Sequence, residues 1–168
     1  MQRRTWLKLG AVSATVLILA GGATALWQPG LQQGRLSPGA QDVFASVARA
    51  ILDGTLPTEP AQVQAALAGL AQRIDALVQA LPPHVQAELS QVLGILGTGI
   101  GRRTLAGLAP DWRSASVAEV QQALQSMRTS SLALRLQSYQ ALHDIVGAAY
   151  FSDASTWPAL GYPGPLTI

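Results

Sequence analysis

The residues with the clearest capacity for chemistry are His143 and Asp144, which could act as a general base and its orienting acid. Adjacent residues of a helix point about 100° apart, so we do not expect their side chains to pair directly. His143 also falls on an apolar helical stripe with Leu136 and Tyr139. We therefore interpret His143 as a partly buried, hydrogen-bonded structural residue. His84 follows two prolines at a helix start and is expected to be exposed.

A second candidate is a glycine series made of Gly94, Gly97, Gly99 and Gly101. It could form a phosphate-binding loop, but the Walker spacing with its lysine is missing and no strand is expected before it. No acidic residue follows about twenty residues later within a βαβ unit. We therefore predict a helix–helix junction at which the backbones approach closely. The neighbouring pair Arg102-Arg103 is interpreted as a solvated helix edge.

Other catalytic and metal-binding patterns are missing from the sequence. The chain has no cysteine, which excludes disulfides, thiolate zinc sites, iron–sulfur clusters and covalent c-type haem. It contains two histidines, no G-x-S-x-G nucleophile elbow and no E-x-x-H spacing. We therefore expect no catalytic residue, no metal site and no cofactor-binding site in this chain.

The composition is that of a globular domain, with 168 residues, of which 49% are hydrophobic and 12% are charged. The formal net charge is +2, but Arg3, Arg4 and Lys8 lie within the first ten residues. Without these three, eight cations face nine acids and the net charge is −1. Nucleic acid is therefore excluded as a partner, because its binding needs a basic surface.

Residues 1–26 have the layout of an export signal. An uncharged, largely apolar run from Leu9 to Ala20 precedes a small-residue cleavage site formed by Ala23 and Ala25. The basic start before this run is typical of the twin-arginine pathway, which carries folded proteins across the membrane. Its residues are Arg3, Arg4, Trp6, Leu7 and Lys8.

We expect cleavage after Ala25 and a periplasmic location. The alternative is an uncleaved signal that anchors the chain in the membrane, because residues 9–27 carry no charge and are long enough to span it.

Apolar periodicity predicts an all-α fold, a small bundle of about five to six helices over residues 39–150, preceded by a linker over 27–38. Ser37 and Pro38 predict the start of the first helix, and a capping box at Ser116 and Glu119 predicts another. Further helices are expected over 61–80, from 83 onward, in a short piece to about 108, and over 130–149. No alternating strand pattern is found.

Residues 151–168 are predicted to form an extended C-terminal docking tail. The tail contains Trp157, Tyr162, three prolines and two glycines, and Asp153 is its one charged residue. It cannot be helical throughout, and it is too apolar to remain fully solvated. It is expected to pack on this domain or on another protein, and both alternatives stay open. Trp112 is likewise expected in the core or in an interface.

The tail sequence Gly161-Tyr162-Pro163-Gly164-Pro165, after the aromatic pair Tyr150-Phe151 at a helix end, resembles the gluconate 2-dehydrogenase subunit 3 family. Residues 50–57 are also similar to an early helix-end segment of that family, with leucine in place of isoleucine before Pro57. The resemblance covers the export signal, the first helix and about the last forty residues.

This resemblance implies a non-catalytic accessory subunit that stabilises and co-exports a large dehydrogenase of the glucose–methanol–choline type. FAD and the catalytic residues would then belong to the large subunit, and in some members a cytochrome c subunit accepts the electrons. The twin-arginine translocase would be a transient partner. The expected partner-binding residues are Tyr150, Phe151, Trp157, Tyr162, Pro163 and Pro165.

Two alternative functions remain open at this point. An export chaperone or scaffold would bind the dehydrogenase in the cytoplasm and be released after delivery. An independent periplasmic hydrolase would use His143 and would be active as the isolated chain.

Overall fold

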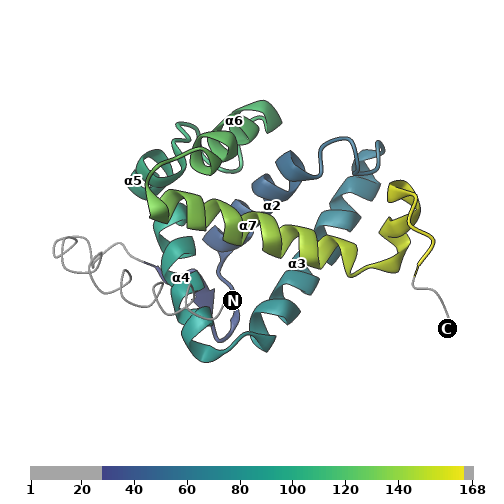
Figure 1. The fold of residues 1–168 in the computed structure, drawn as a ribbon, viewed down its shortest axis with the longest axis horizontal. Helices are drawn as coiled ribbons and strands as arrows, with labels where there is room; N and C mark the ends of the chain where they lie inside the picture. Colours follow the sequence, from purple (N-terminus) through teal and green to yellow (C-terminus); the bar gives the residue numbers. More distant parts are fainter. Residues whose placement is uncertain (1–27, 165–168) are drawn as a thin grey trace.

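The computed structural model describes residues 28–164, which fold into a small bundle of helices with one short hairpin (Figure 1). This confirms the predicted all-α class. The elements are β1 (Leu31–Gln32), β2 (Arg35–Leu36), α2 (Pro38–Ile51), α3 (Pro60–Ala80), α4 (Pro83–Gly97), α5 (Gly99–Gly101), the π-helix η1 (Arg102–Ala106), α6 (Val117–Arg128), α7 (Ala133–Phe151) and the 3₁₀ helix η2 (Ala154–Leu160).

Several predicted residues lie outside the described part of the chain. They are the export-signal residues Arg3, Arg4, Trp6, Leu7 and Lys8, the cleavage-site residues Ala23 and Ala25, and Pro165 of the tail. Within residues 28–164, no helix combines the length and the hydropathy that a membrane span requires.

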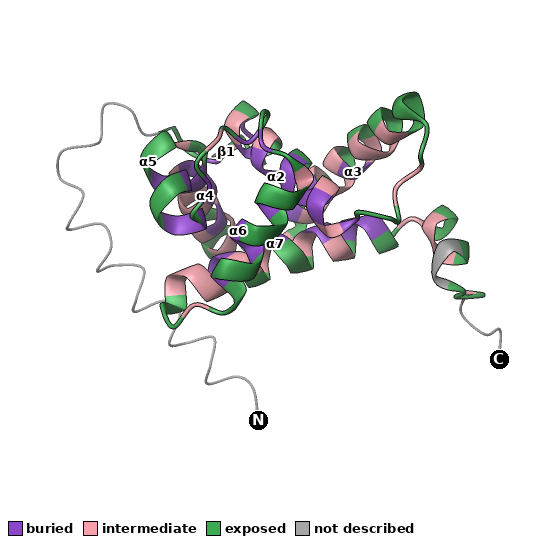
Figure 2. Cartoon of the chain, turned by 90° about the horizontal axis from the view of Figure 1, so that it is seen from above, coloured by how far each residue is buried: buried purple, intermediate pink, exposed green. Residues whose placement is uncertain are grey.

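Helix α2 lies at the centre of the bundle and packs against α3, α4, α6 and α7. Val43, Phe44 and Val47 recur at helical spacing on its inner side and are fully buried, as the purple segments of Figure 2 illustrate. Ser37 begins this helix, because its hydroxyl oxygen accepts a hydrogen bond from the N–H of Ala40 at 3.3 Å. Pro38 occupies the first turn, as predicted.

The other long helices also follow the predicted spacing. Helix α3 buries Leu70, Ile74 and Val78 at four-residue intervals, and the prolines after Leu81 separate it from α4. The predicted capping box of α6 is confirmed, with Glu119 accepting from the N–H of Ser116 at 2.9 Å. This backbone hydrogen bond lowers the pKa of Glu119.

The linker predicted for residues 27–38 is wrong over most of that range. Strands β1 and β2 pair antiparallel across a two-residue turn at Gln33 and Gly34, both of which have positive φ. The hairpin is attached to α4, because Ser90 accepts from the N–H of Gly30 at 3.0 Å and from that of Leu31 at 3.0 Å. Strands of two residues are too short to produce a visible alternation in the sequence.

The predicted helix–helix junction in the glycine series is confirmed. Helix α4 ends at Gly97 and α5 begins at Gly99, with Thr98 as the N-cap. The backbones approach most closely at Gly101, where an added Cβ would overlap the carbonyl oxygen of Ile95.

Arg102 is buried, so its assignment to a solvated helix edge is wrong. Its guanidinium donates to the carbonyl oxygens of Leu108 at 3.3 Å and Ala109 at 3.2 Å and forms an ion pair with Asp111. Arg103, the next residue, is exposed as predicted. The guanidinium of Arg102 thereby fixes the loop between η1 and α6.

Trp112 follows this loop and lies in the core, which decides between the two alternatives left by the sequence. Its indole N–H donates to the carbonyl oxygen of Leu96 at 2.8 Å, and its own carbonyl accepts from the hydroxyl of Ser46. These two contacts join the loop to α4 and to α2.

We predict that Arg102→Lys lowers the free energy of unfolding by about 2 kcal/mol, because one ammonium group cannot reach the three acceptors that the guanidinium fork satisfies. Urea unfolding followed by far-ultraviolet circular dichroism measures this change. The matched control is Arg103→Lys, for which we expect a change within about 0.5 kcal/mol. Equal stability of the two variants would contradict the role given to Arg102.

Candidate partner-binding surface

The last turn of α7 and the start of η2 are fixed by Arg73 of α3. The guanidinium Nε donates to the carbonyl oxygen of Ala149 at 2.8 Å, and Nη1 lies 3.1 Å from the carboxylate of Asp153. Asp153 is also the N-cap of η2, because its Oδ1 accepts from the N–H of Ser155 at 3.0 Å and from its hydroxyl at 2.7 Å. The tail therefore leaves the domain in a defined direction.

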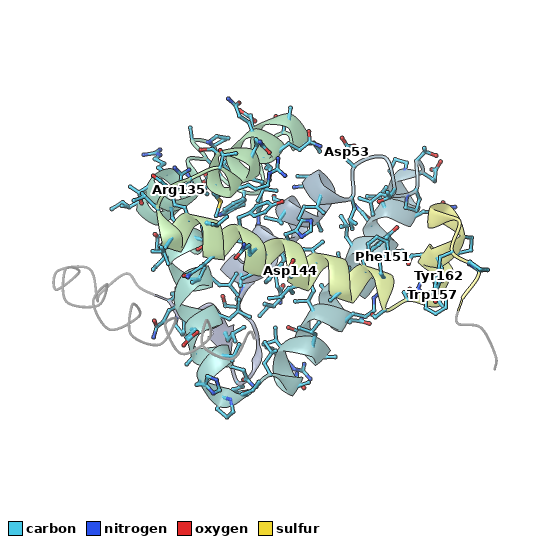
Figure 3. The ribbon with its side chains drawn as sticks, in the orientation of Figure 1. Asp53, Arg135, Asp144, Phe151, Trp157 and Tyr162 are labelled. Carbon is cyan, nitrogen blue, oxygen red and sulfur yellow. The ribbon has the colours of Figure 1, made fainter. Side chains whose placement is uncertain are left out.

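Three aromatic residues of the tail gather at one end of the molecule (Figure 3). The indole N–H of Trp157 donates to the carbonyl oxygen of Phe151 at 2.8 Å. The rings of Trp157 and Tyr162 meet edge to face with their centroids 5.3 Å apart. Phe151 is 37% exposed and Tyr162 is 48% exposed. The ring of Phe151 packs edge to face on that of Tyr150, with their centroids 5.2 Å apart. Accessible aromatic side chains held in place by such contacts are suited to bury further surface against a protein partner.

Gly161 allows the chain to turn back at the end of η2. Its φ of 69° lies in the left-handed region that side chains disfavour. The turn brings Tyr162 to the ring of Trp157, and the N–H of Tyr162 donates to the carbonyl oxygen of Trp157 at 3.2 Å. The aromatic contact therefore depends on this glycine.

The structure corrects two predictions about the tail. Residues 154–160 are not extended but form η2, because Asp153 supplies a helix cap and Pro158 is compatible with a 3₁₀ turn. Tyr150 does not belong to the accessible surface, since its ring is buried and its hydroxyl donates to the carbonyl oxygen of Thr55 at 3.2 Å. Pro163 is exposed.

His143 and Asp144 contradict the sequence interpretation on two points. His143 is exposed, with 49% of its side chain accessible, and its Nδ1 lies 3.2 Å from the Oδ1 of Asp144. The two side chains lean toward each other on the solvent side of α7, which the 100° separation of their Cα–Cβ directions does not prevent. The pair is open to water rather than set in a sheltered pocket of the kind that usually binds substrates. His84 is exposed, as predicted.

In the part of the chain that the structure describes, no three histidine, aspartate or glutamate side chains come together as a metal site would require. Comparison with protein-family models, with curated proteins and with solved structures found no match for this chain. Phe151, Trp157 and Tyr162, which lie at one end of the bundle, form the accessible aromatic cluster that is the candidate partner-binding surface.

We predict that acid loosens the tail through Asp153. The pKa of Asp153 is lowered, first by the hydrogen bond from the Ser155 hydroxyl and then by the Ser155 N–H and the charge of Arg73. The folded tail favours the ionised carboxylate of Asp153. The stabilisation that this carboxylate gives to the tail is therefore complete above the ordinary aspartate pKa of about 3.9. It is lost as the pH falls through the lowered value.

The indole N–H resonance of Trp157 reports this change in an NMR titration, as a step below about pH 3.9. Asp153→Asn removes the titrating group and should abolish the step. Identical titration curves for the two proteins would contradict the capping role of Asp153.

Proposed function

We propose that this chain is a non-catalytic accessory subunit that binds, stabilises and co-exports a periplasmic FAD-dependent dehydrogenase of the glucose–methanol–choline type. The observation that carries the proposal is the accessible aromatic cluster of Phe151, Trp157 and Tyr162, held at one end of the bundle. In this proposal the docking residues are these three together with Pro163 and Pro165, without Tyr150.

The construction of the tail supports a docking role. Arg73 and Asp153 hold its base, and the indole of Trp157 is oriented by the carbonyl oxygen of Phe151. From residue 154 to residue 164 the chain has no charged side chain, so a partner would not have to desolvate a charge. Aromatic residues in such settings are common anchors of protein interfaces.

The proposed partner follows from the family resemblance of the tail sequence. The proposed export route follows from the twin-arginine layout of residues 1–26. A large subunit that folds around FAD in the cytoplasm must cross the membrane folded, and one signal on this chain would serve both proteins. FAD and the catalytic residues would belong to that partner, and a cytochrome c subunit could accept its electrons. The present chain would contribute affinity and stability and no reactive group.

We predict that replacing Trp157 and Tyr162 together by alanine weakens binding to the dehydrogenase about thirtyfold, the loss expected when an aromatic interface anchor is removed. The measurement is co-purification after co-expression with a large FAD-dependent dehydrogenase of the glucose–methanol–choline type from the same organism, followed by titration of the purified subunits. Trp157→Phe keeps the aromatic surface but loses the hydrogen bond to Phe151, and it should bind more tightly than the double variant.

The control is Ile100→Ser, which removes an exposed apolar side chain at the other end of the molecule and should leave binding unchanged. The proposal fails if the flavoprotein is equally soluble, exported and active without this chain. A complex recovered from the cytoplasm but never from the periplasm would instead identify an export chaperone. Hydrolytic activity of the isolated chain that His143→Ala removes would also overturn the proposal.

A further inference from the structure

The charges of the folded chain are unevenly distributed. Residues 99–135 contain five arginines and two acids, a net charge of +3, whereas the other described residues contain three arginines and seven acids, a net charge of −4. Two stretches, residues 89–110 and 120–143, contain no acidic residue. They include four of the five arginines of residues 99–135. The net charge of −1 of residues 28–164 is therefore the sum of +3 over residues 99–135 and −4 over the other described residues.

The fold brings the two acid-free stretches together. Arg135 at the start of α7 donates from Nε to the carbonyl oxygen of Leu105 at 2.9 Å and from Nη2 to the hydroxyl of Ser126 at 2.9 Å. Figure 1 places α5 and the start of α7 at the same end of the molecule, and both contact η1. Figure 3 shows Arg135 at the end opposite to Trp157 and Tyr162.

Three arginines of this end, Arg103, Arg128 and Arg135, take part in none of the ion pairs formed within residues 28–164. Close to them along the chain stand the two most exposed large apolar side chains of the described structure, Ile100 at 79% and Leu132 at 63%. Ile100 lies three residues before Arg103, and Leu132 lies four residues after Arg128. We call these five residues the basic end.

We propose that the basic end binds an anionic membrane surface. The guanidinium groups would form hydrogen bonds to lipid phosphates, and Ile100 and Leu132 would enter the boundary between headgroups and acyl chains. A lipid surface suits these residues, because it offers phosphates to the arginines and an apolar layer to Ile100 and Leu132, which are 79% and 63% exposed. The aromatic tail, at the opposite end, stays accessible to a protein partner.

The absence of cysteine makes this proposal testable on the full chain with site-specific probes. Ile100→Cys, Leu132→Cys and Tyr162→Cys are each labelled with an environment-sensitive fluorophore. They are mixed with vesicles of phosphatidylcholine, either alone or with an equal amount of phosphatidylglycerol. We expect a blue shift of emission at positions 100 and 132 with the anionic vesicles, no shift at 162, and reversal by about 0.5 M salt.

A double variant, Arg103→Ala with Arg128→Ala, tests the charge. Neither side chain makes a hydrogen bond to another element of the described structure, so we expect the fold to persist, as circular dichroism would verify. The affinity for anionic vesicles should fall about twentyfold, since each arginine near such a surface contributes about a fivefold factor. The matched control is Arg35→Ala, which removes an exposed arginine outside residues 99–135 and should leave the affinity for anionic vesicles unchanged.

The proposal is overturned if positions 100 and 132 show no shift, or if neutral vesicles shift them equally. A shift produced only by an acidic protein added in place of vesicles would overturn it in favour of a protein partner. Because the assay contains no flavoprotein, its failure would leave the accessory-subunit proposal untouched, and failure of co-purification would leave this one untouched.

Discussion

The bundle depends on how one buried guanidinium, that of Arg102, satisfies backbone carbonyls that have no helical partner after η1. Its hydrogen bonds to Leu108 and Ala109 and its ion pair with Asp111 close the loop that leads to Trp112. Trp112 then contacts α4 through Leu96 and α2 through Ser46. A polar network thus fixes the relative placement of helices that apolar packing alone would hold less specifically.

Much of this architecture could be predicted from the sequence where a local pattern determines it. The N-cap at Ser37, the capping box at Ser116 and the three-to-four spacing in α3 each specify a helix without reference to the rest of the chain. The short hairpin could not be predicted in this way, because it is stabilised by the contact of Gly30 with Ser90, sixty residues further along.

The same limit applies to the candidate site. Arg102 and Arg103 are adjacent and identical, and Tyr150 and Phe151 are adjacent and both aromatic. In each pair, one side chain is buried and the other is exposed. The side chain that turns inward is the one that finds buried partners, which are the loop of residues 108–111 for Arg102 and Thr55, 95 residues earlier in the chain, for Tyr150. The aromatic composition of the tail was visible in the sequence, whereas its fixation by Arg73 was not.

The tail is held in one conformation by contacts within the chain itself. Trp157 is held by Phe151 and by the ring of Tyr162, and Asp153 caps the 3₁₀ turn. Recognition would therefore begin from a preorganised shape, with little conformational entropy left to lose. Affinity would then be governed by the fit of rigid surfaces, and a complex could assemble without a coupled folding step.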